Sequence, residues 1–262
     1  MTAHKPFALS LSGGGLSSLA YAGFVDELKK HNLVPSYYAG LSGGAMLGVL
    51  LASQLSSLKI IELLKHLETY KVLNFRLKKL EIIDHNKIKT LLRSLLPYKK
   101  FDELPTPALV FTSDLIQKRP VVINSGDIAS AIIASCGLFP MLQPIKRKGF
   151  LLGDGGFTVY YGAQYLREQG IETVIGVDVT GLCEGNVPGI FNALYRQINS
   201  SITSNTRYEL SQYPVDLDIK ITFPAPSIFT INKKTKHLLG LGRHIAQKHL
   251  SKIKEIVRNE EV

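Results

Sequence analysis

The chain has 262 residues, of which 45% are apolar and 20% are charged, and this balance excludes an intrinsically disordered protein. Its 31 basic and 21 acidic residues give a formal net charge of +10. The two cysteines, Cys136 and Cys183, are too few for a disulfide framework or a structural zinc site, which favours a reducing compartment. We expect one domain over residues 1–262, with a motif-bearing core at about 7–179 and an extension of the same domain at about 180–262.

Apolar stretches with strand and helix periodicity alternate along the chain. In chain order, the predicted elements are strand 7–11, helix 16–31, strand 37–41, helix 43–54, helices 58–71 and 87–95, a hairpin of strands 108–113 and 121–124, helix 127–135, strand 149–153, helix 162–169, strand 173–178, helix 190–210, strand 215–223 and helix 241–258. Strands that alternate with helices form a mainly parallel sheet covered by helices on both faces. The sequence therefore predicts a three-layer α/β/α sandwich.

One uncharged stretch, residues 32–58, is long enough to span a bilayer. Its glycines, its proline and its polar residues interrupt the apolar run, so we interpret it as a buried strand, a turn and a buried helix. The first residues also lack the basic start, apolar run and cleavage site of a signal peptide. These features predict a cytoplasmic protein without a signal peptide or a transmembrane helix.

The excess positive charge is concentrated in two predicted helical segments. Residues 59–100 carry a local net charge of +7 and residues 233–262 carry +5, so the rest of the chain is slightly negative. Such runs are typical either of solvated helix faces or of surfaces that attract a polyanion. Because no zinc finger, helix-turn-helix pattern or aromatic–basic stacking motif is present, we expect an anionic membrane surface and no nucleic acid as the partner.

The first glycine-rich turn is Gly13-Gly14-Gly15, which directly follows a predicted strand and precedes a predicted helix. Glycines bring bare N–H groups close to a ligand, and the helix N-terminus adds a partial positive charge. A dinucleotide fingerprint fails because Ser18 stands where its third glycine is required, and no lysine follows as in a Walker loop. We interpret the turn as an oxyanion hole, with a purely structural turn as the alternative.

The second glycine-rich turn reads Gly-Leu-Ser-Gly-Gly, with Ser42 between Gly40 and the pair Gly43 and Gly44. It follows a predicted strand and precedes a predicted uncharged helix, which is the context of a nucleophile elbow. In such an elbow, the flanking glycines permit a strained turn that exposes the serine hydroxyl. The alternative is a serine that only caps a buried helix.

The third turn is Asp154-Gly155-Gly156, at the end of the predicted strand 149–153. Functional residues of parallel sheets gather beyond the carboxyl ends of the strands. We therefore expect Asp154 to lie on the same rim of the sheet as Ser42 and the triple glycine. Taken alone, the motif also fits an ordinary Asp-Gly turn.

A hydrolytic serine needs a base to accept its proton, and histidine is the usual one. Four of the seven histidines lie in the N-terminal tail, at a helix end or in charged helices, and none of the seven lies in a glycine-rich turn. The C-terminal segment holds His237, His244 and His249, so a triad that includes one of these stays open as an alternative.

The three turns together resemble the patatin-like lipid acyl hydrolases. The resemblance covers 7–179 and includes the stretch Ala-Ser-Cys-Gly-Leu-Phe-Pro at 134–140, which is similar to a family segment that precedes the aspartate. It implies a three-layer fold and a Ser–Asp dyad without histidine, in which Ser42 is the nucleophile and Asp154 is the general base. The Gly13–Gly15 amides would form the oxyanion hole, while the other glycines named above support the motifs.

One departure concerns the glycine loop, where the family has Gly-Gly-Gly-x-Arg/Lys-Gly and this chain has Ser17 and Ser18 at the last two positions. The resemblance predicts a phospholipase A or lysophospholipase that acts on lipid esters, and we expect it to need no cofactor and no metal. The two basic segments predict that it binds anionic membranes peripherally. The alternatives are a soluble esterase or thioesterase with a histidine triad, and a catalytically weak lipid-binding protein, which the loss of the basic residue motivates.

Overall fold

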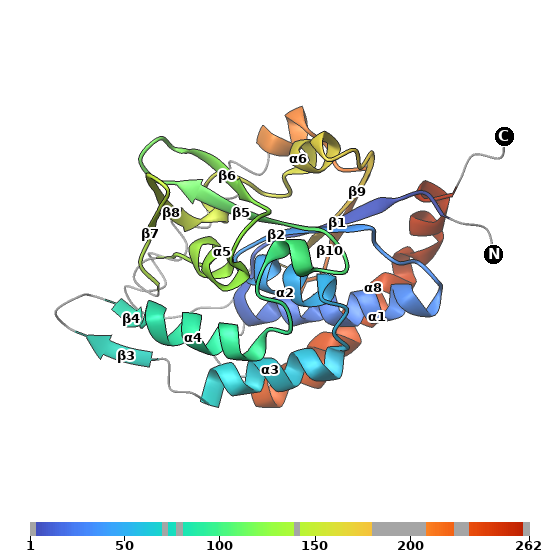
Figure 1. Ribbon diagram of the computed structural model, residues 1–262. Coiled ribbons are helices and arrows are strands. Elements are labelled where there is room, and N and C mark those ends of the chain that lie inside the picture. The colour runs from blue at the N-terminus through green and yellow to red at the C-terminus, as the bar shows by residue number, and fades with distance from the viewer. Residues whose placement is uncertain are drawn as a thin grey trace.

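The structure is a computed structural model that describes residues 4–69, 73–76, 81–138, 142–179, 208–222 and 231–258, of which 67–69, 73–76, 81–83 and 231–234 are described by their backbone alone. The eight strands of the main sheet have the spatial order β10-β9-β1-β2-β5-β8-β7, and β6 pairs with the other edge of β5 (Figure 1). Their bounds are β1 Phe7–Leu11, β2 Tyr37–Leu41, β5 Ala108–Asp114, β6 Arg119–Ile123, β7 Ile145–Arg147, β8 Phe150–Asp154, β9 Thr173–Asp178 and β10 Leu217–Lys220. A separate two-stranded sheet contains β3 (Leu73–Arg76) and β4 (Glu81–Ile83).

Helices cover both faces of the main sheet. Their bounds are α1 Ala20–Lys30, α2 Gly43–Ala52, α3 Ser57–Thr69, α4 His85–Leu95, α5 Ile128–Ser135, α6 Ala163–Glu168 and α8 Ile231–Ile256, with short 3-10 helices at Gly15–Leu19, Phe101–Glu103 and Gly155–Phe157. Of these helices, all except α6 lie on one face, and α6 lies on the other together with the helical residues 208–212 (Figure 1).

Alternate residues of β1 point into two separate hydrophobic cores. Phe7, Leu9 and Leu11 belong to the larger core, which α1, α2, α5 and α8 complete, whereas Ala8 belongs to a smaller core beneath α6. This alternation is the period of a strand that is covered on both sides. The three-layer α/β/α prediction is therefore confirmed.

The strand directions differ across the sheet. The strands β10, β9, β1, β2 and β5 pair in parallel, whereas β6, β7 and β8 are antiparallel to their neighbours. Thus the sheet is mainly parallel, as predicted, with an antiparallel end. Strand β7 was not predicted, because a three-residue strand with two basic residues shows no apolar periodicity. Part of the predicted helix 190–210 lies outside the described residues.

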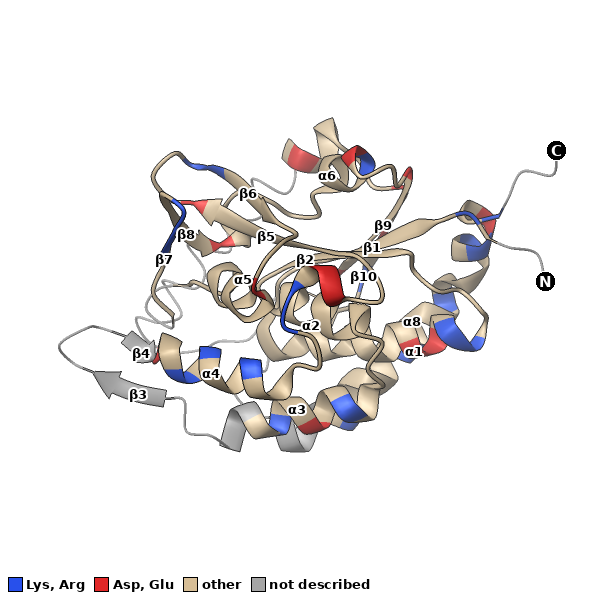
Figure 2. Cartoon of the chain, in the orientation of Figure 1, with Lys and Arg blue, Asp and Glu red and all other residues tan. Residues whose placement is uncertain are grey.

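The two basic segments of the sequence fall mainly on α3, α4 and α8. These helices lie on the same side of the sheet, and α3 packs against α8 (Figures 1 and 2). No helix within the described ranges has the length and the apolar composition that crossing a membrane requires.

Candidate functional site

Ser42 lies on the sharp turn between β2 and α2. Its backbone has φ 52° and ψ −125°, a conformation that costs free energy for any residue other than glycine. The neighbouring chain leaves no room for side chains, because a Cβ added at Gly40 would lie 2.5 Å from the carbonyl carbon of Gly44. The turn therefore has the strained geometry of a nucleophile elbow.

Ser135, the last residue of α5, holds this turn in place. The N–H of Ser42 donates to Ser135 Oγ at 2.8 Å, and the Ser135 hydroxyl donates to the carbonyl oxygen of Phe111 at 2.6 Å. These two bonds join α5, β5 and the elbow. From the sequence, Ser135 was noted only as part of the stretch 134–140 that is similar to a family segment, and no role was predicted for it.

Asp154 lies near Ser42 because their strands, β8 and β2, pair with adjacent residues of β5. On one edge of β5, Leu41 of β2 pairs with Phe111, and Asp154 of β8 pairs with the next residue, Thr112. Because β8 is antiparallel to β5, the C-terminal ends of β2 and β8 meet along this edge of β5. We expected Asp154 and Ser42 to lie on the same rim of the sheet because their strands would be parallel. This reason is wrong: the two residues are close, but the strand that carries Asp154 is antiparallel to β5.

The carboxyl group of Asp154 is buried, with the residue 5% exposed. Burial raises the pKa of Asp154 to about 6, and hydrogen bonds from the Gly156 N–H, at 2.9 Å, and from the Ser42 side chain oppose this rise. Ser113 fixes the backbone of the aspartate by donating to its carbonyl oxygen at 2.7 Å. The result is a buried carboxylate that interacts with the Ser42 side chain and is more basic than an ordinary aspartate.

The glycine loop lies against the elbow. A Cβ added at Gly13 would lie 3.4 Å from Ser42 Cβ, and one added at Gly43 would lie 2.8 Å from the Gly15 nitrogen. Among the described residues, no acceptor takes the N–H groups of Gly13, Gly14, Gly15 or Gly43. Within the described ranges, four N–H donors without an acceptor thus lie in the glycine loop and at the start of α2, on either side of the elbow. The Gly43 donor, which the sequence analysis counted only as motif support, follows the nucleophile directly, where such donors are often found.

Gly14 should tolerate a side chain less well than Gly15. Gly14 has φ 142°, and an added Cβ would lie 2.6 Å from Val179 Cγ2, whereas Gly15 has φ 54° and open space around it. We expect Gly14→Ala to lower kcat about a hundred- to a thousandfold, the usual cost of one lost oxyanion donor, and Gly15→Ala to lower it less. Steady-state kinetics on a short-chain ester measure both. Normal turnover of a folded Gly14→Ala protein would show that the loop is only a turn.

Two serines replace the last two family residues of this loop, and both are buried. Ser18 is fully buried, and within the described part of the chain its hydroxyl has no hydrogen-bond partner. A Cβ added at Gly43 would lie 2.5 Å from Ser18 Oγ, so this hydroxyl lies against the elbow. Ser17 is 2% exposed. Because it is a serine, there is no charged side chain at the position where the family has arginine or lysine.

Cys136 follows Ser135 and borders the candidate dyad, a position that sequence reasoning did not predict. Burial raises the pKa of the Cys136 thiol well above its usual range, the nearby Asp154 carboxylate adds to this rise, and a hydrogen bond with Ser42 opposes it. The thiol therefore stays protonated, and a neutral thiol is a poor nucleophile. Ser42 is the stronger candidate for the reacting group.

The candidate histidines lie on α8, which packs against α1. His237 and His244 are exposed, and His249 Nδ1 bonds to the carbonyl oxygen of Ile245. Over the described ranges, none of the hydrogen-bond partners of Ser42 and Asp154 is a histidine. In the same part of the chain, no three His, Cys, Asp or Glu side chains gather where they could hold a metal ion.

Comparisons with known proteins place the chain among related sequences and folds. The family model described as patatin-like phospholipase matches residues 9–162. An uncharacterised NTE-family protein of Mycobacterium tuberculosis is 27% identical over 151 residues, which cover 57% of this chain and 42% of that protein. Human patatin-like phospholipase domain-containing protein 6 is 25% identical over 182 residues, which cover 66% of this chain and 13% of that protein. The chain thus spans less than half the length of these curated relatives.

Solved structures resemble the fold at low sequence identity. VipD from Legionella pneumophila superposes with a TM-score of 0.59 at 14% identity, over 95% of this chain and 67% of that chain. Human GIVD cytosolic phospholipase A2 superposes with a TM-score of 0.51 at 13% identity, over 97% and 59% of the two chains. The family match covers more than half of the chain and contains all three glycine-centred turns. The chain therefore belongs to the patatin-like phospholipase family.

Proposed function

We propose that the protein is a serine hydrolase that cleaves carboxylic ester bonds of membrane lipids, as a phospholipase A or lysophospholipase. The observation that carries this proposal is the hydrogen bond between Ser42, on a strained elbow, and the buried carboxylate of Asp154, next to a glycine loop whose N–H groups have no acceptor among the described residues. Family membership supports the same chemistry. We also propose that residues 1–262 act as one domain and that the reaction takes place at a membrane surface in the cytoplasm.

The first half of the proposed reaction transfers the acyl group to the enzyme. Asp154 accepts the proton of the Ser42 hydroxyl while Ser42 Oγ bonds to the ester carbonyl carbon. The carbonyl oxygen becomes an oxyanion, which the N–H groups of the glycine loop and of Gly43 stabilise. When the tetrahedral intermediate collapses, the ester C–O bond breaks and the leaving alcohol takes the proton from Asp154.

The second half releases the fatty acid by the same steps. A water molecule gives a proton to Asp154 and attacks the acyl-serine carbonyl, and the oxyanion forms at the same donors. Collapse breaks the bond to Ser42 Oγ, which recovers the proton from Asp154. One buried carboxylate is sufficient for both proton transfers because it is free again after each one.

Product analysis tests the proposal directly. Mixed phospholipids are incubated with the wild type and with Ser42→Ala, and fatty acids and lysolipids are measured by mass spectrometry. We expect both products to appear only with the wild type. A fluorophosphonate probe should also label Ser42 in the folded protein. If neither labelling nor products appeared, the protein would be a lipid-binding protein with little activity. The serine at position 17, where the family has a basic residue, is the observation that supports this alternative.

The rate should depend on the protonation of Asp154. Its pKa is about 6, so below that pH the carboxyl group holds a proton and cannot accept one from Ser42. We expect kcat/KM on a short-chain ester to fall about tenfold per pH unit below pH 6 and to be level above it. A pH series from 4.5 to 8.5 measures this. His237→Ala, His244→Ala and His249→Ala should each leave the profile unchanged, and loss of activity in any one would support the histidine triad instead.

A further inference from the structure

Two hairpin turns lie side by side at one edge of the main sheet. Asp114 of β5 pairs with Arg119 of β6 on one side and with Leu152 of β8 on the other, and Arg147 of β7 pairs with Phe150 of β8. The β5–β6 turn and the β7–β8 turn therefore project from the same end of their strands. We call residues 115–119 and 146–149 together the hairpin edge.

The hairpin edge extends past the candidate site. Asp154 pairs with Thr112 of β5, and Ile116 lies four residues further along the same chain segment. At about 3.3 Å per strand residue, the tip of the edge lies about 13 Å beyond Asp154. A flat surface that met this tip would therefore lie within about 13 Å of Asp154.

The edge is strongly basic. Lys118, Arg119, Lys146 and Lys148 are exposed, and within the described ranges none of them forms an ion pair. The acidic residue at the base of the first turn, Asp114, is 2% exposed and accepts the N–H of Ile116. Figure 2 shows basic residues at the start of β6 and along β7.

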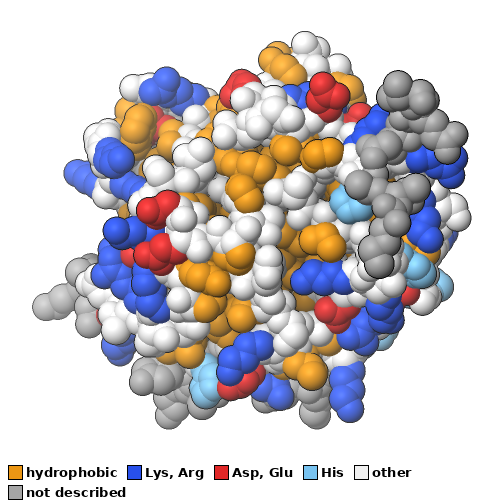
Figure 3. Space-filling model, turned by 45° about the vertical axis from the view of Figure 1, so that its right-hand side comes forward, with side chains coloured by type: hydrophobic (Ala, Val, Ile, Leu, Met, Phe, Trp, Pro, Cys, Tyr) orange, Lys and Arg blue, Asp and Glu red, His pale blue; other side chains and the backbone are white. Residues whose placement is uncertain are grey.

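An apolar side chain lies at the tip of this basic surface. Ile116 is 66% exposed, although isoleucine is usually buried. The Arg119 guanidinium lies over the Phe150 ring, 5.8 Å from its centre, which keeps the charged group at the edge. Figure 3 shows basic side chains around apolar ones at the margin of the molecule where the hairpins lie. An exposed apolar residue within a ring of cations matches the chemistry of an anionic bilayer, with phosphates outside and acyl chains beneath.

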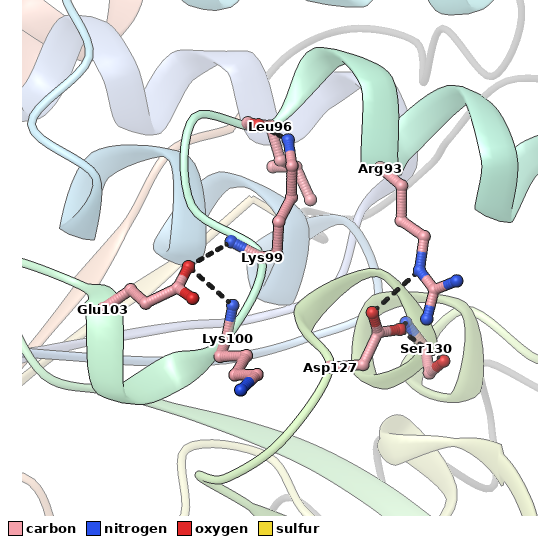
Figure 4. A network of polar contacts seen from close by, with 7 residues as sticks. All are labelled: Arg93, Leu96, Lys99, Lys100, Glu103, Asp127 and Ser130. Atoms are coloured by element: carbon pink, nitrogen blue, oxygen red, sulfur yellow. Dashed lines mark hydrogen bonds and ion pairs between the residues drawn. The ribbon is translucent and has the colours of Figure 1, made fainter.

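The basic helices fit that role less well, because acidic residues pair with several of their cations. Within the described ranges, these ion pairs are Lys59–Glu62, Arg93–Asp127, Arg243–Asp26 and Lys252–Glu255. Figure 4 shows the Arg93 pair, with Ser130 beside Asp127, and Glu103 accepting the N–H groups of Lys99 and Lys100. These pairs neutralise part of the charge on the helices, whereas the four cations of the hairpin edge have no acidic partner within the described ranges.

We propose that the hairpin edge is the surface that docks on an anionic lipid bilayer, with Ile116 inserted among the lipids and the four cations on their phosphates. This inference rests on the proposed function and assigns the membrane contact to a surface that the charge pattern of the sequence did not indicate. Docking in this way brings Ser42 and Asp154 close to the lipid headgroups. The substrate is then a lipid taken from the bilayer beneath the edge.

Charge reversal tests the proposal against the helices. Vesicles of phosphatidylcholine alone, or with phosphatidylserine, are sedimented with protein in the Ser42→Ala background, so that no hydrolysis alters the lipid. The test protein carries Lys118→Glu, Arg119→Glu, Lys146→Glu and Lys148→Glu. The matched control carries Lys87→Glu, Lys236→Glu, Lys248→Glu and Lys254→Glu, which produce the same change in net charge on α4 and α8.

We expect the hairpin variant to lose about two orders of magnitude in affinity for the anionic vesicles, since each cation near such a surface contributes severalfold. The helix variant should lose only a few fold. Equal losses, or a larger loss in the helix variant, would overturn the assignment. Circular dichroism and thermal unfolding of both variants show that the fold is unchanged.

A fluorescence reporter gives a second readout, because the chain contains no tryptophan. Ile116→Trp places a reporter at the tip, and Leu58→Trp places one at a residue that is 75% exposed at the start of α3. With anionic vesicles, we expect emission from Ile116→Trp to shift to shorter wavelength and to be quenched by brominated lipid. A shift in Leu58→Trp without one in Ile116→Trp would assign docking to the helices.

Activity on two substrates separates this inference from the proposed function. In a background with Ser42 intact, the hairpin variant should turn over a soluble short-chain ester normally and lose hydrolysis of anionic vesicles. Unchanged hydrolysis of the vesicles would overturn the docking surface. If Ser42→Ala retained hydrolysis, the proposed function would fail, whereas the vesicle-binding result would still decide where the protein docks.

Discussion

Ser42→Ala is expected to reduce kcat/KM for ester hydrolysis by several orders of magnitude while the fold is retained. The hydroxyl contributes little to packing, because the elbow is held by backbone contacts and by the bond from the Ser42 N–H to Ser135. Kinetics on a short-chain ester measure the loss, and thermal unfolding measures the fold.

Ser94→Ala provides a matched control for this experiment. The Ser94 hydroxyl donates to the carbonyl oxygen of Leu91 on α4 and lies outside the candidate site. Its removal should leave activity unchanged. A folded Ser42→Ala protein that retained most of the wild-type rate would exclude Ser42 as the nucleophile.

Asp154→Asn should abolish activity and at the same time stabilise the fold at alkaline pH. The pKa of Asp154 is about 6 in the folded protein, above its ordinary value of 3.8, because burial disfavours the charged form. The stability that comes from this raised pKa is fully present below about pH 4 and is lost as pH rises through 6. An asparagine has no such pH dependence, yet its amide oxygen can still accept the Gly156 N–H.

Urea denaturation at pH 4 and at pH 8 measures this effect. Relative to the wild type, Asp154→Asn should gain on the order of 2–3 kcal/mol in free energy of unfolding between the two pH values. A stabilised but inactive variant would identify a group whose burial serves the chemistry at the expense of stability. If Asp154→Asn were active, or if its stability followed that of the wild type at every pH, the carboxylate would not be the buried base.

Much of the fold could be predicted because its signals are local. The strands Phe7–Leu11, Tyr37–Leu41 and Thr173–Asp178 are short apolar runs between turn residues, and the structure has them at the predicted bounds. Ser42 was identifiable because the elbow needs glycines at fixed spacing between a strand and a helix. These features depend on neighbouring residues alone.

The direction of β8 could not be predicted, because a strand's orientation depends on which distant strand it pairs with. The bond from the Ser42 N–H to Ser135 could not be predicted for the same reason, because it joins residues that are distant in the chain. The hairpin edge was missed because its cations fall in two groups, at 118–119 and at 146–148, which separate windows of sequence do not add together. Only the pairing of β5 with β6 and β8, and of β8 with β7, gathers them.

The head-to-head meeting of β2 and β8 along β5 has a consequence for how the protein can evolve. A residue inserted within β8, between Leu152 and Asp154, would turn the carboxylate to the other face of the sheet and separate it from Ser42. A residue inserted at Lys148 or Gly149, beyond the paired segment, would leave that register intact. The turns that form the hairpin edge can therefore change in length and composition between lineages while the candidate pair stays in place, so that the proposed preference for a membrane can diverge without a change in the proposed chemistry.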